Sequence, residues 1–107
     1  MKLVLSVLAA LTLGGLVSST ALADGPEVFR AQGCTKCHSV TVAGIQRQTP
    51  HDEEGKDLSK VGSRHDKKAI ALFMLKKTEI AGEKHKKLFG GTTEQLKTVA
   101  EWLETLK

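Results

Sequence analysis

Two cysteines and a histidine stand together in the segment Cys34-Thr35-Lys36-Cys37-His38. On a helical turn, thiols three residues apart face the same way, so both can reach the vinyl groups along one edge of a porphyrin. The imidazole that follows directly can then bind the iron as an axial ligand. The spacing C-x-x-C-H is accordingly typical of covalent c-type haem attachment. We therefore expect one haem, attached through Cys34 and Cys37, with His38 as the proximal ligand.

Other chemistry fits this segment less well. A dithiol redox pair also uses C-x-x-C, but it is expected within a βαβ pattern, which the chain lacks. A structural zinc site needs four well-spaced ligands, and the adjacent Cys37 and His38 cannot easily bind one tetrahedral ion. The chain has two cysteines in total, so no second C-x-x-C exists to complete such a site. Haem attachment is the favoured interpretation.

The N-terminal segment, residues 1–23, has the form of an export signal. Lys2 precedes an apolar stretch from Leu3 to Val17, and Ala21-Leu22-Ala23 has the small-x-small pattern of a cleavage site. The apolar stretch is short for a transmembrane helix, which needs about 20 residues. We predict a signal peptide over residues 1–23, with an uncleaved anchor as the alternative. Because c-type haem is attached to exported protein outside the cytoplasmic membrane, we expect a periplasmic location.

The remainder, residues 24–107, is predicted to form one small domain. Of all 107 residues, 40% are hydrophobic and 4% aromatic, and the N-terminal stretch holds a large share of the apolar ones. A domain of this size is near the limit at which an apolar core alone is sufficient. No disulfide framework can compensate, because both cysteines belong to one motif. These counts exclude a multidomain enzyme, a disulfide-rich secreted module and a polytopic membrane protein.

A short helix and a long loop are predicted for the first half of this domain. Residues 25–32 can form a helix in which Pro26 suits the first turn, where its missing N–H costs nothing. Residues 41–57 show no periodicity and carry glycine, proline and acidic residues, which is typical of a loop. A loop of this length is unusual in so small a domain, but it is reasonable if it wraps a large buried group.

Two longer helices are predicted for the second half. One is expected to begin after Ser63, with Asp66 as its partner in a capping box, and to end at Lys77. A connector rich in lysine and glycine follows. The last helix begins with the capping box Thr92-x-x-Gln95 and continues with apolar residues at helical spacing. The chain shows no alternating strand pattern, so the predicted fold class is all-α.

Together these features resemble the class I c-type cytochromes, a family of small monohaem electron carriers. The segment Gly25-x-x-x-Phe29 looks like the family's N-terminal helix, whose glycine and aromatic residue pack against the C-terminal helix. Trp102 stands where that C-terminal helix usually has an aromatic residue. The resemblance covers nearly all of residues 24–107. It implies a monohaem cytochrome c domain with about three main helices around one covalently attached haem c.

Two shorter segments extend the resemblance. Residues 55–58, Gly-Lys-Asp-Leu, resemble a Gly-Pro-Asp-Leu segment in which the proline carbonyl accepts a hydrogen bond from the proximal histidine. Lys56 replaces the proline, and its backbone carbonyl can still serve. Residues 61–64, Val-Gly-Ser-Arg, resemble a stretch whose arginine contacts a haem propionate, which implies that role for Arg64.

The sixth iron ligand departs from the family pattern. The family usually has a Gly-x-x-Met-Pro-like loop before the last helix, and here His85 occupies the methionine position and Lys86 the proline position. His85 precedes Trp102 by 17 residues, which is similar to the family's spacing. We therefore predict His85 as the distal ligand. The alternatives are Met74, which lies on an apolar helical stripe, His65, His51, a lysine, or an open site.

The resemblance implies a one-electron carrier of a respiratory chain, and not an enzyme. A distal imidazole in place of a thioether predicts a low potential, because methionine ligation raises it. A haem-based sensor or small-ligand-binding protein is one alternative, if His85 does not coordinate the iron. A dedicated haem subunit of a respiratory oxidoreductase is another. A peroxidase role is the least favoured, because no distal acid–base pair is recognisable.

The basic residues suggest a protein partner. The chain has 16 Lys and Arg against 12 Asp and Glu, for a net charge of +4. Several lysines flank the predicted ligand loop, and we expect them to attract a redox partner that is acidic at its docking face. The alternative is an ordinary solvated surface. Nucleic-acid binding is not expected, because the basic residues are not interleaved with aromatic ones. No stable membrane insertion is expected once the signal is cleaved.

Overall fold

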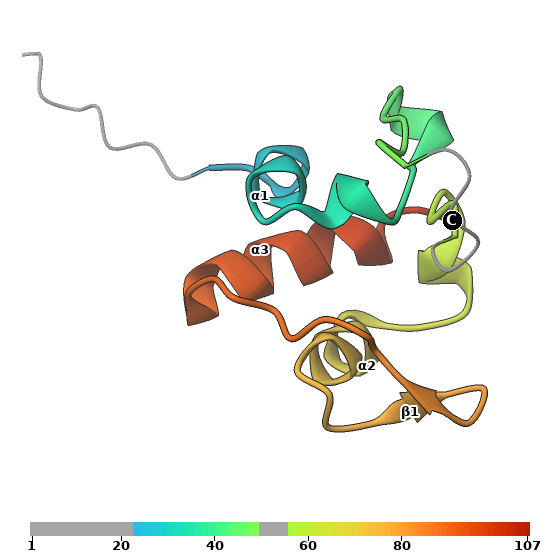
Figure 1. Ribbon diagram of the computed structural model, residues 1–107, viewed down its shortest axis with the longest axis vertical. Coiled ribbons are helices and arrows are strands. Elements are labelled where there is room, and N and C mark those ends of the chain that lie inside the picture. The colour runs from blue at the N-terminus through green and yellow to red at the C-terminus, as the bar shows by residue number, and fades with distance from the viewer. Residues whose placement is uncertain (1–22, 50–55) are drawn as a thin grey trace, which may run out of the picture.

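The computed structural model describes residues 23–49 and 56–107, and within these ranges it contains three α-helices and a small β-ribbon (Figure 1). The helices are α1 (Gly25–Ala31), α2 (Lys67–Met74) and α3 (Thr93–Glu104). The ribbon pairs β1 (Glu79–Ile80) with β2 (Glu83–Lys84) in antiparallel fashion. The fold also contains three short 3₁₀ turns, which are η3 (Cys34–Lys36), η4 (Thr41–Ala43) and η5 (Val61–Ser63). The predicted all-α fold class is confirmed, although the short β-ribbon was not predicted.

Some predictions fall outside the described residues. Nearly all of the predicted signal segment lies in the range 1–22, and His51 and Gly55 lie in the range 50–55. Among the helices that the structure describes, none has the length and apolar character that crossing a membrane requires.

Helix α3 lies between α1 and α2 and packs against both (Figure 1). A Cβ placed on Gly25 would overlap the Cβ and Cγ atoms of Trp102, so only glycine permits this approach of α1 to α3. The rings of Phe29 and Trp102 meet edge to face, with centroids 5.6 Å apart. The packing of the first helix against the last, implied by the family resemblance, is therefore present. The core joins all three helices through Val28, Phe29, Ile70, Met74, Val99 and Leu103.

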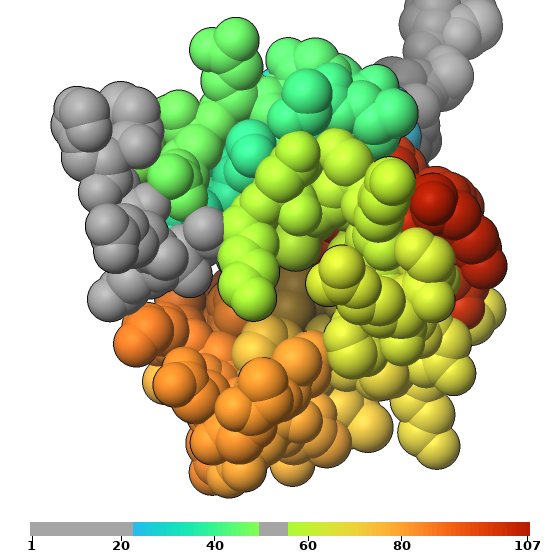
Figure 2. All heavy atoms as spheres, turned by 90° about the vertical axis from the view of Figure 1, so that its right-hand side faces the viewer, coloured from blue at the N-terminus to red at the C-terminus, as the bar shows by residue number. Residues whose placement is uncertain are grey.

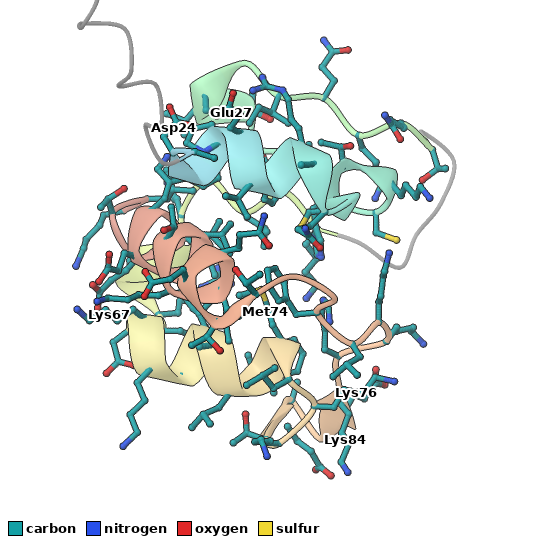
Figure 3. All side chains as sticks on the ribbon, turned by 90° about the vertical axis from the view of Figure 1, so that its left-hand side faces the viewer. Asp24, Glu27, Lys67, Met74, Lys76 and Lys84 are labelled. Carbon is teal, nitrogen blue, oxygen red and sulfur yellow. The ribbon has the colours of Figure 1, made fainter. Side chains whose placement is uncertain are left out.

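Helices α1 and α3 are both capped at their N-termini by polar side chains close in sequence. The Asp24 carboxylate accepts a hydrogen bond from the Glu27 N–H at 3.0 Å and so caps α1, as Figure 3 shows with both residues labelled. In α3, Gln95 N–H donates to the Thr92 hydroxyl and Thr92 N–H donates to the Gln95 side chain, which is a complete capping box. The predicted start of the last helix is confirmed.

The predicted bounds of the second helix are wrong at both ends. Helix α2 begins at Lys67 and is capped by Asp66, whose carboxylate accepts from the Ala69 N–H at 2.8 Å. Ser63 instead ends η5, where its hydroxyl donates to the Lys60 carbonyl. The helix stops at Met74, and the backbone of Lys76, with φ of 61°, cannot continue it.

The long loop after the haem-attachment motif is closed at its base. Ser39 pairs with Asp57, and the Leu58 N–H donates to the Ser39 carbonyl at 2.8 Å. The Asp57 carboxylate accepts from the backbone N–H and the hydroxyl of Thr41, and also from both donors of Ser59. These contacts fix the segment that begins at Lys56 beside the segment that carries His38.

Candidate haem site

The Cys34–His38 segment folds as a tight turn directly after α1. Gly33, with φ of 78°, ends α1 in the left-handed conformation that glycine adopts without strain. The N–H groups of Cys37 and His38 then both donate to the Cys34 carbonyl. Cys34 is half-buried, Cys37 is exposed, and both are free thiols. Burial raises the pKa of the Cys34 thiol, and the nearby positive charge of Lys87 opposes this effect.

The His38 ring is oriented by the segment across the loop base. Its Nδ1 lies 2.9 Å from the Lys56 backbone carbonyl and 3.2 Å from the Lys56 N–H. The shorter contact requires a hydrogen on Nδ1, and that tautomer leaves Nε2 as a lone-pair ligand. Desolvation lowers the pKa of His38, followed in the same direction by the charges of His85 and Arg47, against the hydrogen bond to Lys56. The environment therefore favours the neutral imidazole that a metal needs.

His85 reaches the same place from the loop that follows β2. Its Nδ1 lies 2.5 Å from the Lys87 carbonyl, an arrangement that again leaves Nε2 available. The Phe73 ring of α2 contacts the His85 ring edge to face, with centroids 5.2 Å apart and planes at 68°. Within the described residues, neither Nε2 of His38 nor that of His85 has a hydrogen-bond partner.

The two imidazole rings are nearly parallel, and the separation of their centres suits two ligands of one metal. Their centroids are 6.2 Å apart and their planes differ by 8°. An imidazole nitrogen binds a first-row metal at about 2 Å, and the ring centre lies about 1 Å beyond it, so two axial imidazoles have centres about 6 Å apart. The separation of His38 and His85 is thus compatible with an iron bound by both, and Cys34 and Cys37 would supply the two sulfur atoms of thioether attachment.

The surface is hollowed on this side of the molecule. Figure 2 shows a depression between the segment that follows Lys56 and the segment around residues 84–88. The first of these segments carries the carbonyl that orients His38, and the second carries His85. A group held by His38 and His85 would lie near this depression.

The structure also places three other residues that the sequence singled out. Met74 is buried in the core between the helices, and its carbonyl accepts a hydrogen bond from the Phe89 N–H at 3.0 Å (Figure 3). His65 lines an open groove formed by α2 and β1, and neither His38 nor His85 lines that groove. Arg64 is exposed where η5 ends, and the role of a propionate contact implied for it stays a prediction.

One residue of the site was not identified from the sequence. Phe73 looked like an ordinary member of the apolar stripe of the second helix, yet its ring contacts His85. The sequence carries no local signal for this contact, because the two residues come from different elements. Lys87, expected to be a surface charge, contributes its carbonyl to His85, and a backbone contact of this kind is independent of side-chain type.

Most of the chain matches the model of one protein family. The family model described as Cytochrome c matches residues 22–107, which include the C-x-x-C-H segment and His85. No curated protein and no solved structure matches the chain significantly.

Proposed function

Because the chain belongs to the cytochrome c family, we propose that it is a periplasmic monohaem c-type cytochrome that carries single electrons in a respiratory chain at low potential. The haem, when bound, supplies an iron that alternates between the ferric and ferrous states, and no substrate bond is made or broken. The residues of this chain attach the haem, hold its iron from both sides and present its edge to partners.

The proposed residue roles follow from the site geometry. Cys34 and Cys37 attach the haem, and His38 and His85 are its axial ligands. The observation that carries the proposal is the parallel pair of imidazoles with centroids 6.2 Å apart. Each ring has its Nδ1 against a backbone carbonyl, which orients the ring and makes Nε2 a better donor. Met74, in contrast, would have to leave the core to reach an iron.

The low potential follows from the ligands. Axial methionine raises the potential of a c-type haem, and an imidazole in its place stabilises the ferric state. A potentiometric titration of the holoprotein should therefore give a lower midpoint than that of the His85→Met variant. An unchanged or lower midpoint in the variant would contradict ligation by His85.

Optical spectroscopy tests the ligation directly. The ferric holoprotein should be low-spin, should lack the near-infrared charge-transfer band of methionine–iron ligation, and should not bind carbon monoxide when reduced. His85→Ala should open the site to carbon monoxide, while Met74→Leu should leave the iron low-spin. His65→Ala is the matched control, because it removes an imidazole that lines a different groove. Carbon monoxide binding by the unmodified protein would favour the sensor alternative instead.

The proposed partner is a redox protein with an acidic docking face. Lys84, Lys86 and Lys87 lie in or directly after β2, on either side of His85, and are exposed. Leu88 follows them with 56% of its surface exposed, which is high for a large apolar side chain. An apolar residue beside positive charges suits a transient docking surface, in which charges steer the approach and apolar contact holds the complex. If this surface docks the partner, electron transfer should slow as the salt concentration rises.

The periplasmic location is proposed from the sequence of residues 1–23 and from the chemistry of haem attachment. Expression with the c-type haem maturation machinery, followed by fractionation, should place the haem-containing protein in the periplasm. N-terminal sequencing of that fraction should begin at Asp24. Intact residues 1–23 on the mature protein would instead indicate an anchored form.

A further inference from the structure

The orientation of the His85 ring has two determinants in the structure. One is the Lys87 carbonyl, which lies on the same loop as His85. The other is the ring of Phe73, which belongs to α2 and meets His85 edge to face. A contact within one loop can fix how the ring sits on that loop, but it cannot fix how the loop sits relative to His38. A contact to a packed helix can.

The loop is joined to α2 at a second point close by. The Phe89 N–H donates to the Met74 carbonyl at 3.0 Å, so the loop on the far side of His85 is hydrogen bonded to the end of α2. Met74 is adjacent to Phe73 and is buried in the core. Helix α2 in turn packs against α3, and α3 packs against α1, which leads directly into the turn that carries His38. A continuous packed framework therefore relates one imidazole to the other.

We propose that Phe73 is a positioning residue that holds the His85 imidazole plane parallel to that of His38. The proposal rests on the proposed axial ligation by His85. The observed angle between the His38 and His85 planes is 8°, and the Phe73 ring stands at 68° to the His85 ring with the two centroids 5.2 Å apart. Aromatic pairs prefer this edge-to-face geometry, so rotation of His85 in either direction loses contact with Phe73.

The relative orientation of two axial imidazoles has an electronic consequence. Each imidazole interacts through its π-system with the iron d orbital that is perpendicular to its plane. Parallel planes act on the same d orbital and separate it in energy from its partner, which gives ferric low-spin iron a rhombic electron paramagnetic resonance (EPR) spectrum. Perpendicular planes act on both orbitals equally, so the largest g-value rises and the other features broaden. Phe73 therefore sets a property of the iron without touching it.

The unmodified holoprotein provides the first test. Its frozen ferric EPR spectrum should be rhombic, as parallel planes require. A spectrum dominated by one large g-value would show that the planes are not parallel in solution, and it would overturn the proposal. This measurement depends on no variant and so cannot be obscured by misfolding.

Substitution of Phe73 provides the second test. Phe73→Leu and Phe73→Met keep an apolar side chain but remove the flat ring, so the largest g-value should shift upward and the rhombic pattern should be lost or broadened. Phe73→Tyr keeps the ring and should keep the original spectrum. Phe89→Leu is the matched control, because Phe89 is a partly buried phenylalanine that packs against the core cluster, and the substitution keeps the backbone N–H that bonds the loop to Met74. Its spectrum should match the original.

Optical spectra of the same samples separate the two hypotheses. If Phe73→Leu remains low-spin without the methionine band but keeps the original EPR spectrum, the positioning role is wrong while ligation by His85 stands. If the unmodified protein shows the methionine band or high-spin iron, the ligation itself is wrong, and the positioning role is overturned with it. A merely structural role for Phe73 would lower stability without moving the g-values.

Discussion

The Nδ1 of His38 lies 2.9 Å from the backbone carbonyl of Lys56, which is 18 residues further along the chain. Because the acceptor is a backbone atom, the contact does not depend on the side chain at position 56. The side chain of Lys56 is exposed, and the contact with His38 is made by the Lys56 backbone. In the resembling Gly-Pro-Asp-Leu segment, a proline stands at the position of Lys56. Proline offers the same backbone carbonyl and has a more restricted backbone.

Replacing Lys56 with proline tests this relationship. Lys56→Pro should leave the haem spectrum unchanged and should raise the free energy of unfolding by about 0.4–1 kcal/mol, because proline restricts the unfolded chain. The lost N–H should cost little, since Nδ1 cannot both donate to the carbonyl and accept from the N–H. Urea denaturation of the two holoproteins measures the difference.

A destabilised Lys56→Pro variant with altered ligation would contradict this assignment. It would mean that the Lys56 N–H is the functional partner and that His38 carries its hydrogen on the other nitrogen. Lys60→Pro is not a suitable comparison, because Lys60 flanks η5. Lys56→Ala is the appropriate control, and it should match the unmodified protein in both measurements.

Covalent haem attachment should be required for a stable fold. In Cys37→Ala, one of the two thioether bonds cannot form, and expression with the maturation machinery should give little folded holoprotein. Lys36→Ala, at the exposed position next to it, should mature normally. Acid–acetone extraction should leave the haem on the unmodified protein, and its removal by that treatment would contradict covalent attachment. Circular dichroism and the haem absorption of purified protein report both outcomes.

Local signals in the sequence predicted part of the fold correctly. The capping box of Thr92 and Gln95 requires residues only three positions apart, and both of its hydrogen bonds are present. The predicted start of α2 was wrong because Ser63 and Asp66 are both acceptable N-cap residues, and the structure uses Asp66. The choice between them depends on α3, since the Lys67 N–H also donates to the Glu104 carboxylate at 3.0 Å. A contact between residues so far apart leaves no local pattern.

The β-ribbon was missed for a similar reason. Each strand has two residues, which is too short for an alternating pattern to be recognised. The turn between them has positive φ at both Ala81 and Gly82, as a type I′ turn requires, but such turns usually carry Asn-Gly.

In the candidate site, the C-x-x-C-H motif indicated the two cysteines and His38, and the resemblance suggested His85. The contact of Phe73 with His85 could not be predicted, because it depends on how α2 and the loop meet.

The close approach of Gly25 to Trp102 predicts a strong effect of a single methyl group. Gly25→Ala should destabilise the protein by about 1–3 kcal/mol, because the new Cβ overlaps Trp102 and α1 must move away from α3. The intrinsic helix preference for alanine over glycine is about 1 kcal/mol or less and does not offset this. Ala31→Gly, at the exposed end of α1, measures the size of this helix preference in the same helix. Thermal unfolding of the holoproteins measures both, and an unaffected Gly25→Ala would contradict the observed helix packing.

Charge reversal near His85 should slow electron transfer to an acidic partner. Lys84→Glu should lower the second-order rate several-fold at low ionic strength, and the difference should shrink as salt rises, because screening acts over about 8–10 Å. Lys67→Glu is the matched control, since it makes the same change in net charge at the start of α2. Figure 3 shows Lys84 with Lys76 at one end of the molecule and Lys67 away from them. Equal effects of the two variants would show that the lysines near His85 contribute only to net charge and do not form a docking surface. Stopped-flow kinetics with a partner of known acidic surface measures the rates.

Asp57 should make the loop base sensitive to acid. Desolvation by itself would raise the pKa of Asp57, but the hydrogen bonds from Thr41 and Ser59 together outweigh it, so the pKa lies below its ordinary value. A carboxylate with a lowered folded-state pKa stabilises the fold fully above the unfolded-state value, which is about 3.9. This contribution is lost as the pH falls through the lowered pKa. Asp57→Asn should therefore reduce stability at neutral pH, and the two proteins should converge in acid.

The position of Asp57 gives this pH dependence a consequence at the haem site. Asp57 is adjacent to Lys56, so opening the loop base would release the carbonyl that orients His38. Urea denaturation from neutral pH to about pH 2, followed at the haem absorption band, should show Asp57→Asn as less stable down to about pH 4, and the difference should disappear only below that pH. Asp52→Asn, which removes a carboxylate five residues earlier in the sequence, is the control for charge alone. A stability difference for Asp57→Asn that persists unchanged in acid would mean that its hydrogen bonds do not depend on ionisation, and the assigned cause would be wrong.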